Sequence, residues 1–253
     1  MSGPILSVRG LTKRFGGLIA VNNVDFDLPA GELHAIIGPN GAGKTTFFNL
    51  VSGFLPPNAG RVVFDGQDIT GMPTHRISQL GMARTLQIKS VFNGLSVYDN
   101  VWIAAHSRHK FLHPLKAARS FGATAEVAAQ ALAAVELTDR TSELAGNLAY
   151  GDVALLEIAI AIAMKPKLLL LDEPVAGMSP EETQRTVHKI KELSQSVNIL
   201  MIEHDMETVF EVADRITVMT QGVVLCQGTV KEIANDPRVQ EAYLGVPEDS
   251  THA

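Results

Sequence analysis

The chain has 253 residues, of which 46% are hydrophobic and 19% charged, and its formal net charge is −6. This composition supports a globular fold with a substantial core, and the acidic balance disfavours a nucleic-acid-binding protein, which usually presents a basic surface. Cys226 is the only cysteine, so no disulfide can form within the chain, as expected in a reducing compartment. The first residues show no signal-peptide pattern, and no apolar run approaches the roughly 20 residues that cross a bilayer. We therefore expect a chain that does not itself span a membrane.

The first part of the chain reads as strands with one helix. Apolar, β-branched runs bounded by glycine, proline or asparagine predict strands, and the Asp65-Gly66 pair predicts a tight hairpin turn. The predicted elements are strands at 5–10, 21–28 and 32–38, a turn at 29–31, a helix at 45–54 closed by Gly53, and a hairpin at 61–70.

The character of the sequence changes between residues 94 and 164. Alanine-rich stretches with helical periodicity replace the strand runs, which predicts a helical lobe inserted into a sheet domain. Residues 167–173 and 197–205 then return to apolar runs typical of parallel strands buried on both faces. Residues 215–228 predict a second hairpin that turns at Gln221-Gly222, and the polar tail at 247–253 is expected to fray. The alternation of strands and helices indicates an α/β fold.

Residues 38–45, GPNGAGKT, fit the pattern of a phosphate-binding loop between a strand and a helix. Glycines let the backbone curl until its N–H groups converge on phosphate oxygens, and the following helix adds the positive end of its dipole. Lys44 can then reach the β- and γ-phosphates, and the Thr45 hydroxyl can bind Mg²⁺. The alternative is a purely structural glycine turn. The predicted cradle comprises Gly38, Pro39, Asn40, Gly41, Ala42, Gly43, Lys44, Thr45 and Thr46.

An apolar strand at 168–171 ends in two acids, Asp172 and Glu173. This position is the carboxyl edge of a parallel sheet, where the ligands of such sheets bind. Asp172 is therefore expected at the Mg²⁺ shell, and Glu173 beside the attacking water. The alternative is a pair of acids that caps a following helix.

With these features in order, the chain resembles the ATP-binding-cassette (ABC) transporter ATPase subunits over nearly its full length. The resemblance rests on six features in register: Phe15, residues 38–45, Gln87 in RTLQ, LAYGD at 148–152, LLLLDE at 168–173 and His204 in IEHD. It implies a P-loop NTPase fold of the ABC type, with an antiparallel β subdomain and an inserted helical subdomain. It also implies one ABC ATPase domain over 1–253, with a core sheet domain at 1–93 and 165–253 and a helical subdomain at 94–164 that carries the signature segment.

The resemblance implies roles for three residues that the pattern alone would leave open. Phe15 is expected to stack on adenine, against the alternative that it fills a hydrophobic gap. Gln87 is expected to approach Mg²⁺ and the attacking water. Without the resemblance, the preferred interpretation of Gln87 is a surface residue. His204 is expected to donate a hydrogen bond to the γ-phosphate, although a lone histidine at a strand end is more often a satisfied polar group. Glu173, His204 and Gln87 thus form the expected catalytic set, and Thr45, Gln87 and Asp172 the metal set.

The signature segment departs from the LSGGQ-like pattern of the family. In that family two subunits meet head to tail, and each signature contacts the ATP held by the partner. Here Ala149 takes the serine position, Tyr150 and Gly151 follow, and Asp152 replaces a glutamine. Loss of the serine removes a hydrogen bond of about 1.5–3 kcal/mol to a charged group, while the backbone N–H of Gly151 and the helix dipole remain. Asp152 is unfavourable near a polyphosphate unless it points away or caps the helix.

Two further stretches near the signature depart from the family. The run at 153–164 lacks the usual arginines, so we expect deeper packing or a hydrophobic partner surface. Ser179 stands where the family usually has Asp or Asn.

The altered signature serves the partner's ATP, whereas this chain's cradle and acids serve its own. We therefore expect ATP hydrolysis, most simply in a heterodimer, with a homodimer as the alternative.

Several stretches resemble the branched-chain amino-acid importer branch, among them LTKRFGGLIAVNNVDF, ITGMPTHRISQLGMARTLQ and DPRVQEAYLG. This branch implies a second ATPase subunit, two membrane permease subunits and an extracytoplasmic solute-binding protein, with this subunit peripheral on the cytoplasmic face of the membrane. Alternatives are an importer of urea or short amides, and a low-turnover nucleotide-binding regulatory subunit. An ABC ATPase of DNA repair or translation would carry a coiled-coil insertion or two fused cassettes, and we expect neither in a chain of 253 residues with a net charge of −6.

The insert at 106–119 contains three histidines, His106, His109 and His113. Their helical spacing raises the possibility of a metal site, but Pro114 follows, no carboxylate joins them and their neighbours are cationic. The insert is better interpreted as a solvated basic face.

Overall fold

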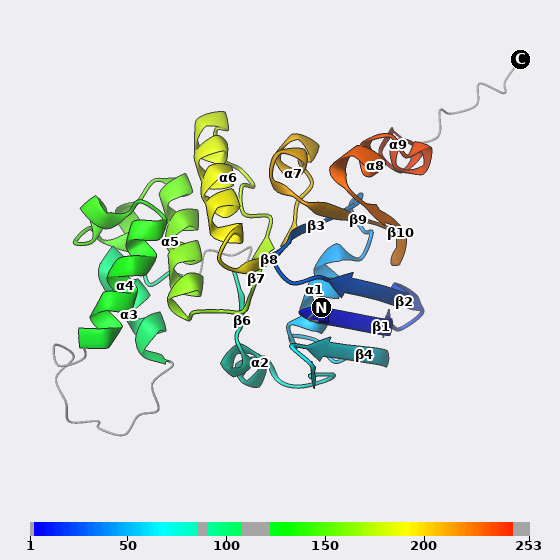
Figure 1. The fold of residues 1–253 in the computed structure, drawn as a ribbon, viewed down its shortest axis with the longest axis horizontal. Coiled ribbons are helices and arrows are strands. Elements are labelled where there is room, and N and C mark those ends of the chain that lie inside the picture. The colour runs from blue at the N-terminus through cyan, green and yellow to red at the C-terminus, as the bar shows by residue number, and fades with distance from the viewer. Residues whose placement is uncertain (1–2, 86–90, 108–121, 245–253) are drawn as a thin grey trace, which may run out of the picture. The chain divides into compact units, whose positions relative to one another are not determined.

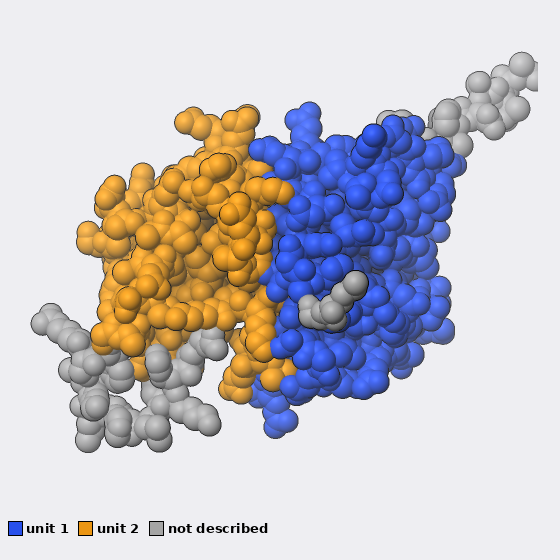
Figure 2. Space-filling model, in the orientation of Figure 1, with its two compact units in different colours: residues 1–77, 198–253 blue, residues 78–197 orange. Residues whose placement is uncertain are grey.

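The computed structural model describes residues 3–85, 91–107 and 122–244 and divides into two compact units (Figures 1 and 2). Unit 1 comprises residues 1–77 and 198–253, and unit 2 comprises residues 78–197.

Unit 1 contains two sheets. The antiparallel sheet has the order β2-β1-β4-β5, and β1, β2 and β4 lie side by side in Figure 1. Its strands are β1 (Leu6–Phe15), β2 (Leu18–Leu28), β4 (Ala59–Phe64) and β5 (Gln67–Asp68). In the other sheet, β3 (Leu33–Ile37) runs parallel to β8 (Asn198–Ile202) and β9 (Arg215–Thr220), and β10 (Val223–Gly228) pairs antiparallel with β9. Every residue of β3 is buried, as predicted for a parallel strand covered on both faces.

The two predicted hairpin turns are confirmed. Asp65 and Gly66 join β4 to β5 with φ of 48° and 77°, and Gln221 and Gly222 join β9 to β10 with φ of 47° and 81°. Positive φ at both central residues is the type I′ geometry that matches the twist of paired strands. The first two strands extend further than predicted and meet where Phe15 pairs with Leu18, because cross-strand pairing continues through a polar stretch without apolar alternation.

The helices of unit 1 are short. They are α1 (Lys44–Val51), α7 (Met206–Val212), α8 (Val230–Ala234) and α9 (Pro237–Leu244), while α2 (Thr74–Leu80) contains the border between the units. The helix predicted at 45–54 is confirmed as α1, and Gly53 follows it with φ of 75°. A Cβ at Gly53 would lie 2.4 Å from the Met72 carbonyl oxygen, so only glycine fits this helix end. Phe47 of α1 is buried against the edge of Phe26, with 5.5 Å between ring centroids.

Unit 2 combines a parallel strand pair with helices. Strand β6 (Met82–Arg84) pairs with β7 (Leu168–Asp172), which is fully buried. The helices are α3 (Val97–Ser107), α4 (Gly122–Ala134), α5 (Tyr150–Ala163) and α6 (Pro180–Ser194), with 3₁₀ turns η2 (Thr138–Arg140) and η3 (Ala145–Asn147). Helices α3, α4 and α5 pack on one another, as the alanine-rich periodicity predicts (Figure 1). No helix in the described ranges is long and apolar enough to cross a membrane.

Candidate functional site

The glycine loop that the sequence predicts to bind phosphate lies between β3 and α1. Gly38, Gly41 and Gly43 have φ of 151°, 81° and 96°, a region that other residues rarely adopt. A Cβ at Gly38 would lie 2.1 Å from the Met219 carbonyl oxygen, and one at Gly43 would lie 2.3 Å from that of Ala20. Neighbouring strands therefore press against the outside of the loop and leave room for glycine alone.

Lys44 is the first residue of α1, and its side chain turns back over the loop. Its ammonium donates to the carbonyl oxygens of Gly38 at 2.6 Å and Pro39 at 3.1 Å, and the residue is buried. The first turn of α1 carries no acidic side chain, so the positive end of the helix dipole is not neutralised locally. A buried ammonium above glycine amides at a helix start is a site for an anion such as a phosphate chain.

His204 lies at the same edge of the sheet as the loop. Strands β3 and β8 are parallel with Ile36 opposite Ile202, so the residues after each strand emerge together. The His204 side chain is 59% exposed, and its Nδ1 lies 3.6 Å from Oε2 of Glu203, which is fully buried. Glu203 also accepts the backbone N–H of His204 at 3.0 Å. Glu203 therefore fixes the backbone of His204, while the imidazole ring remains accessible to solvent.

Asp205 fixes the segment that follows His204. Its carboxylate is the N-cap of α7 and accepts from the Thr208 hydroxyl at 2.6 Å and from the backbone N–H of Glu207 at 3.2 Å. The hydrogen bond from Thr208 is the main cause that holds the pKa of Asp205 below its usual value. Neither Glu203 nor Asp205 was predicted; the IEHD sequence contained both acids, but only the fold shows that one is buried and the other caps a helix.

In unit 2, Asp172 ends β7 with its side chain almost fully buried. Its Oδ2 accepts a hydrogen bond from Nη2 of Arg84 at 2.8 Å, and the Arg84 side chain is only 8% exposed. Within the described ranges, Oδ1 of Asp172 is buried without a hydrogen-bond donor. Glu173 follows with φ of 49°, a strained conformation for a non-glycine residue that is often found at functional sites. Sequence reasoning did not single out Arg84, because a lone arginine three positions before Gln87 carries no motif.

The signature segment begins α5, whose N-cap is Ala149. Ala149 offers no side-chain cap, and the backbone N–H of Gly151 instead donates to Oε1 of Glu182 at 2.9 Å. The other carboxylate oxygen of Glu182 accepts from the backbone N–H and the hydroxyl of Ser179, both at 3.0 Å, in a capping box at the start of α6. Glu182, which was not predicted, thus joins the starts of α5 and α6. Tyr150 is exposed.

The Asp152 carboxylate is buried and does not cap α5; it faces two arginines within unit 2. Its Oδ1 lies 2.8 Å from Nη1 of Arg185 on α6, and its Oδ2 lies 3.3 Å from Nη1 of Arg140 in η2. The expected conflict between this acid and a nearby phosphate is thus balanced by two cations inside unit 2. Most side chains of the apolar run at 153–164 are buried within unit 2, in agreement with the deeper packing expected for a run that lacks arginines.

Besides the phosphate-binding loop, the acids and the signature segment, three further features are predicted from the sequence: Phe15, Gln87 and the histidines of the 106–119 insert. Phe15 is exposed at the end of β1, with Nζ of Lys13 5.4 Å from its ring centroid, so it does not fill a core gap. Gln87 lies outside the described residues, as do His109 and His113; the ring of His106 stacks on Trp102 at 4.8 Å. Across the described part of the chain, no group of three His, Cys, Asp or Glu side chains could hold a metal ion alone.

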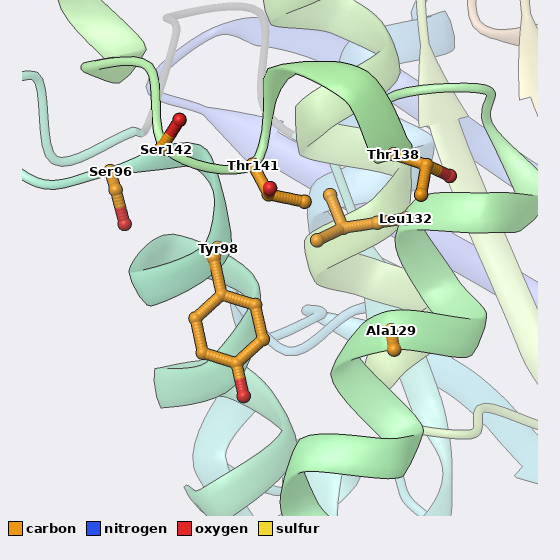
Figure 3. A pocket seen from close by; sticks show the side chains of 7 residues that line it. All are labelled: Ser96, Tyr98, Ala129, Leu132, Thr138, Thr141 and Ser142. Carbon is orange, nitrogen blue, oxygen red and sulfur yellow. The ribbon is translucent and has the colours of Figure 1, made fainter.

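A pocket of about 450 Å³ opens among the helices of unit 2 (Figure 3). Most of the side chains around it carry hydroxyl groups, and its apolar wall comes from α4. It is lined by Ser96, Tyr98, Ala129, Leu132, Thr138, Thr141 and Ser142, so none of the residues predicted to handle nucleotide reaches it.

A glycine loop between a buried parallel strand and a helix, covered by an inward lysine, defines a P-loop nucleotide-binding protein. The family model described as ABC transporter matches residues 21–176, and that described as Branched-chain amino acid ATP-binding cassette transporter matches residues 223–249. The chain belongs to the ABC transporter family, in its ATP-binding cassette component.

Curated relatives match nearly the whole chain. The high-affinity branched-chain amino acid transport ATP-binding protein LivG of Escherichia coli (strain K12) is 44% identical, covering 97% of this chain and 99% of its own length. The corresponding protein BraF of Pseudomonas aeruginosa is 42% identical over the same shares, and the probable LivG of Archaeoglobus fulgidus is 38% identical over 95% of each chain.

The solved structures give the same result for the fold. An ATP-binding cassette of an ABC transporter in its ADP conformation aligns with a TM-score of 0.85 and 30% identity, over 96% of this chain and 99% of its own. A nucleotide-free cassette aligns with a TM-score of 0.84 and 29% identity. The ABC ATPase fold predicted from the sequence is therefore confirmed.

Proposed function

We propose that this chain binds ATP with Mg²⁺ and hydrolyses it to power a membrane importer of branched-chain amino acids. The observation that carries the proposal is the match of about 97% of the chain to proteins named for this transport, together with a C-terminal match to the branched-chain cassette model. The same match favours branched-chain amino acids over urea or short amides, and an ATPase over a low-turnover regulatory subunit.

Residues Gly38 to Thr46 bind the phosphate chain. The backbone amides of the loop and the start of α1 bind phosphate oxygens, since backbone N–H groups and the positive end of the helix dipole meet there. A Cβ at Gly38 or Gly43 would distort the loop that holds these amides. Lys44 exchanges its two carbonyl partners for β- and γ-phosphate oxygens, which are charged and therefore stronger acceptors. Phe15, exposed and next to Lys13, stacks on the adenine ring.

The donor set suits Mg²⁺, which prefers oxygen ligands and keeps several waters. Asp172 fits because its Oδ1 is a buried carboxylate oxygen without a donor among the described residues. Thr45, an exposed residue, and Gln87, which lies outside the described residues, would supply the other ligands. When bound, the metal ion neutralises charge that develops on the β- and γ-phosphate oxygens.

Glu173 orients the attacking water and accepts its proton. The water oxygen bonds to the γ-phosphorus as the bond to the β–γ bridging oxygen breaks, which releases ADP and phosphate. His204 donates a hydrogen bond to the γ-phosphate, with its ring root fixed by the buried Glu203. Removal of either side chain should lower turnover more than it lowers ATP affinity.

In the assembly we propose, this subunit is peripheral on the cytoplasmic face of the membrane. It pairs with a second ATPase subunit, in a heterodimer or a homodimer, and with two permease subunits and an extracytoplasmic solute-binding protein. Ala149 to Asp152, within the helical subdomain 94–164, contribute to the nucleotide held by the second ATPase subunit. The Gly151 amide donates to Glu182 in this structure, so it would exchange this acceptor for a phosphate oxygen of the partner's nucleotide.

Nucleotide binding tests the proposal most simply. The purified chain should bind a fluorescent ATP analogue, and Lys44→Ala should weaken binding at least tenfold. The control Lys231→Ala, at an exposed lysine outside the loop, should alter binding far less. Undiminished binding by Lys44→Ala would overturn the cradle assignment. With permease and binding protein in liposomes, leucine uptake that depends on ATP would support the substrate class, whereas uptake of urea alone would overturn it.

A further inference from the structure

The Arg84–Asp172 pair is a charged contact that the proposed chemistry leaves without a role. The two side chains are 8% and 2% exposed, and Nη2 lies 2.8 Å from Oδ2. The backbone holds them together, because Arg84 on β6 is in register with Leu170 on the parallel strand β7 and the N–H of Thr85 donates to the Leu170 carbonyl at 3.0 Å. Removing two charges from water costs free energy, and a buried ion pair offsets this cost only when its geometry and hydrogen bonds are good.

The contact engages the carboxylate unequally. Arginine often binds a carboxylate through two parallel hydrogen bonds that use both oxygens. Here Arg84 bonds to Oδ2 of Asp172, while Oδ1 is buried without a donor among the described residues. A carboxylate anchored through one oxygen keeps a fixed orientation and offers the other oxygen to a further partner.

We propose that Arg84 is a positioning residue for the metal site: it anchors Oδ2 of Asp172 and so presents Oδ1 to the shell of Mg²⁺. This inference rests on the proposed function. A hydrogen bond that orients a metal-binding side chain typically changes metal affinity by about 10–100-fold when it is removed. The guanidinium charge alone acts in the opposite direction, because its loss would strengthen attraction of a cation to Asp172. The sign of the change therefore separates orientation from simple charge.

The experiment measures the Mg²⁺ requirement of nucleotide binding, without turnover. Binding of a non-hydrolysable ATP analogue is followed by fluorescence, first in EDTA and then across a Mg²⁺ titration, for the wild type, Arg84→Ala, Arg84→Lys and Asp172→Asn. Arg76→Ala, at an exposed arginine, is the control substitution. We expect Arg84→Ala to leave binding in EDTA within about twofold and to raise the half-saturating Mg²⁺ concentration by about tenfold. Arg84→Lys should restore part of the loss, since it keeps a donor without the planar fork.

The combined variant gives a second, independent result. Once Asp172→Asn has replaced the metal-binding carboxylate by a neutral amide, adding Arg84→Ala should cause no further change in Mg²⁺ requirement, because the two residues act through one contact. An unchanged or lower Mg²⁺ requirement in Arg84→Ala would overturn the inference. If Arg84→Ala does not fold, the same shift in Arg84→Lys, judged beside its thermal unfolding, decides the matter. A wild-type chain that binds no ATP analogue would instead overturn the proposed function.

Discussion

Replacement of Asp152 by asparagine tests where the unusual signature acid acts. The substitution keeps the size of the side chain and removes the charge that faces Arg185 at 2.8 Å and Arg140 at 3.3 Å. If this acid faced the partner's phosphates, loss of its charge would relieve repulsion and raise activity. If it serves the interior of unit 2, loss of its charge weakens the ion pairs with both arginines and lowers stability.

The size of the effect follows from burial. A hydrogen bond that involves a charged group contributes about 1.5–3 kcal/mol. The carboxylate is buried, but the two arginine side chains are 42% and 47% exposed, so solvent screens part of the loss. We expect Asp152→Asn to lower the free energy of unfolding by about 2 kcal/mol, which for a chain of this size lowers Tm by about 4–8 °C.

Thermal unfolding followed by circular dichroism measures this change. The control is Asp139→Asn, which removes an exposed aspartate from the same unit and should change stability by less than about 0.5 kcal/mol. The ATPase rate of the assembled transporter is measured in parallel at a temperature where both variants are folded. A variant with the stability of the wild type and a higher ATPase rate would refute the assignment of Asp152 to an internal ion pair.

Three other outcomes follow from the structure. Burial, with a smaller contribution from a nearby cation, lowers the pKa of His34 to about 3 from its ordinary 6.5, so the unfolded chain binds a proton at a higher pH than the folded chain. The free energy of unfolding should therefore fall by about 1.6 kcal/mol from pH 6.5 to pH 5. Denaturant titrations should show this slope, and His34→Gln should remove it. Gly43→Ala would place a Cβ 2.3 Å from the Ala20 carbonyl oxygen and should abolish ATP binding, whereas Gly17→Ala has open space and should bind normally; equal binding would contradict the loop geometry. Glu182→Gln should weaken the link between the starts of α5 and α6 and slow turnover at the partner's nucleotide about tenfold, measured with the partner's site as the only competent one; an unchanged rate would contradict that role.

The sequence predicted the parts of the fold that local chemistry determines. Pairs such as Asp65-Gly66 favour a turn with positive φ at both positions, and short apolar runs bounded by glycine, such as 33–37, favour strands buried on both faces. The phosphate-binding loop was predictable for the same reason, since its glycines and lysine have a fixed spacing. These features depend on neighbours in the chain.

Contacts between distant segments were not predictable. Arg84 and Asp172 are 88 positions apart, and only the pairing of β6 with β7 brings them together. Glu182 reaches Gly151 across 31 positions, and Asp152 was expected to conflict with phosphate because neither of its arginine partners lies nearby in the sequence. The short strand β6 has only three residues, too few for a periodic pattern to indicate it.

The central claim is that this subunit itself hydrolyses ATP during import, and one comparison tests it most directly. ATP turnover and leucine uptake are measured in the reconstituted transporter with Glu173→Gln in this chain, and separately with the matching change in the partner ATPase. We expect the change in this chain to reduce turnover to a few per cent while ATP remains bound, since Glu173 acts on the attacking water. Full turnover with Glu173→Gln here, and loss only when the partner is changed, would show that this subunit binds nucleotide without hydrolysing it.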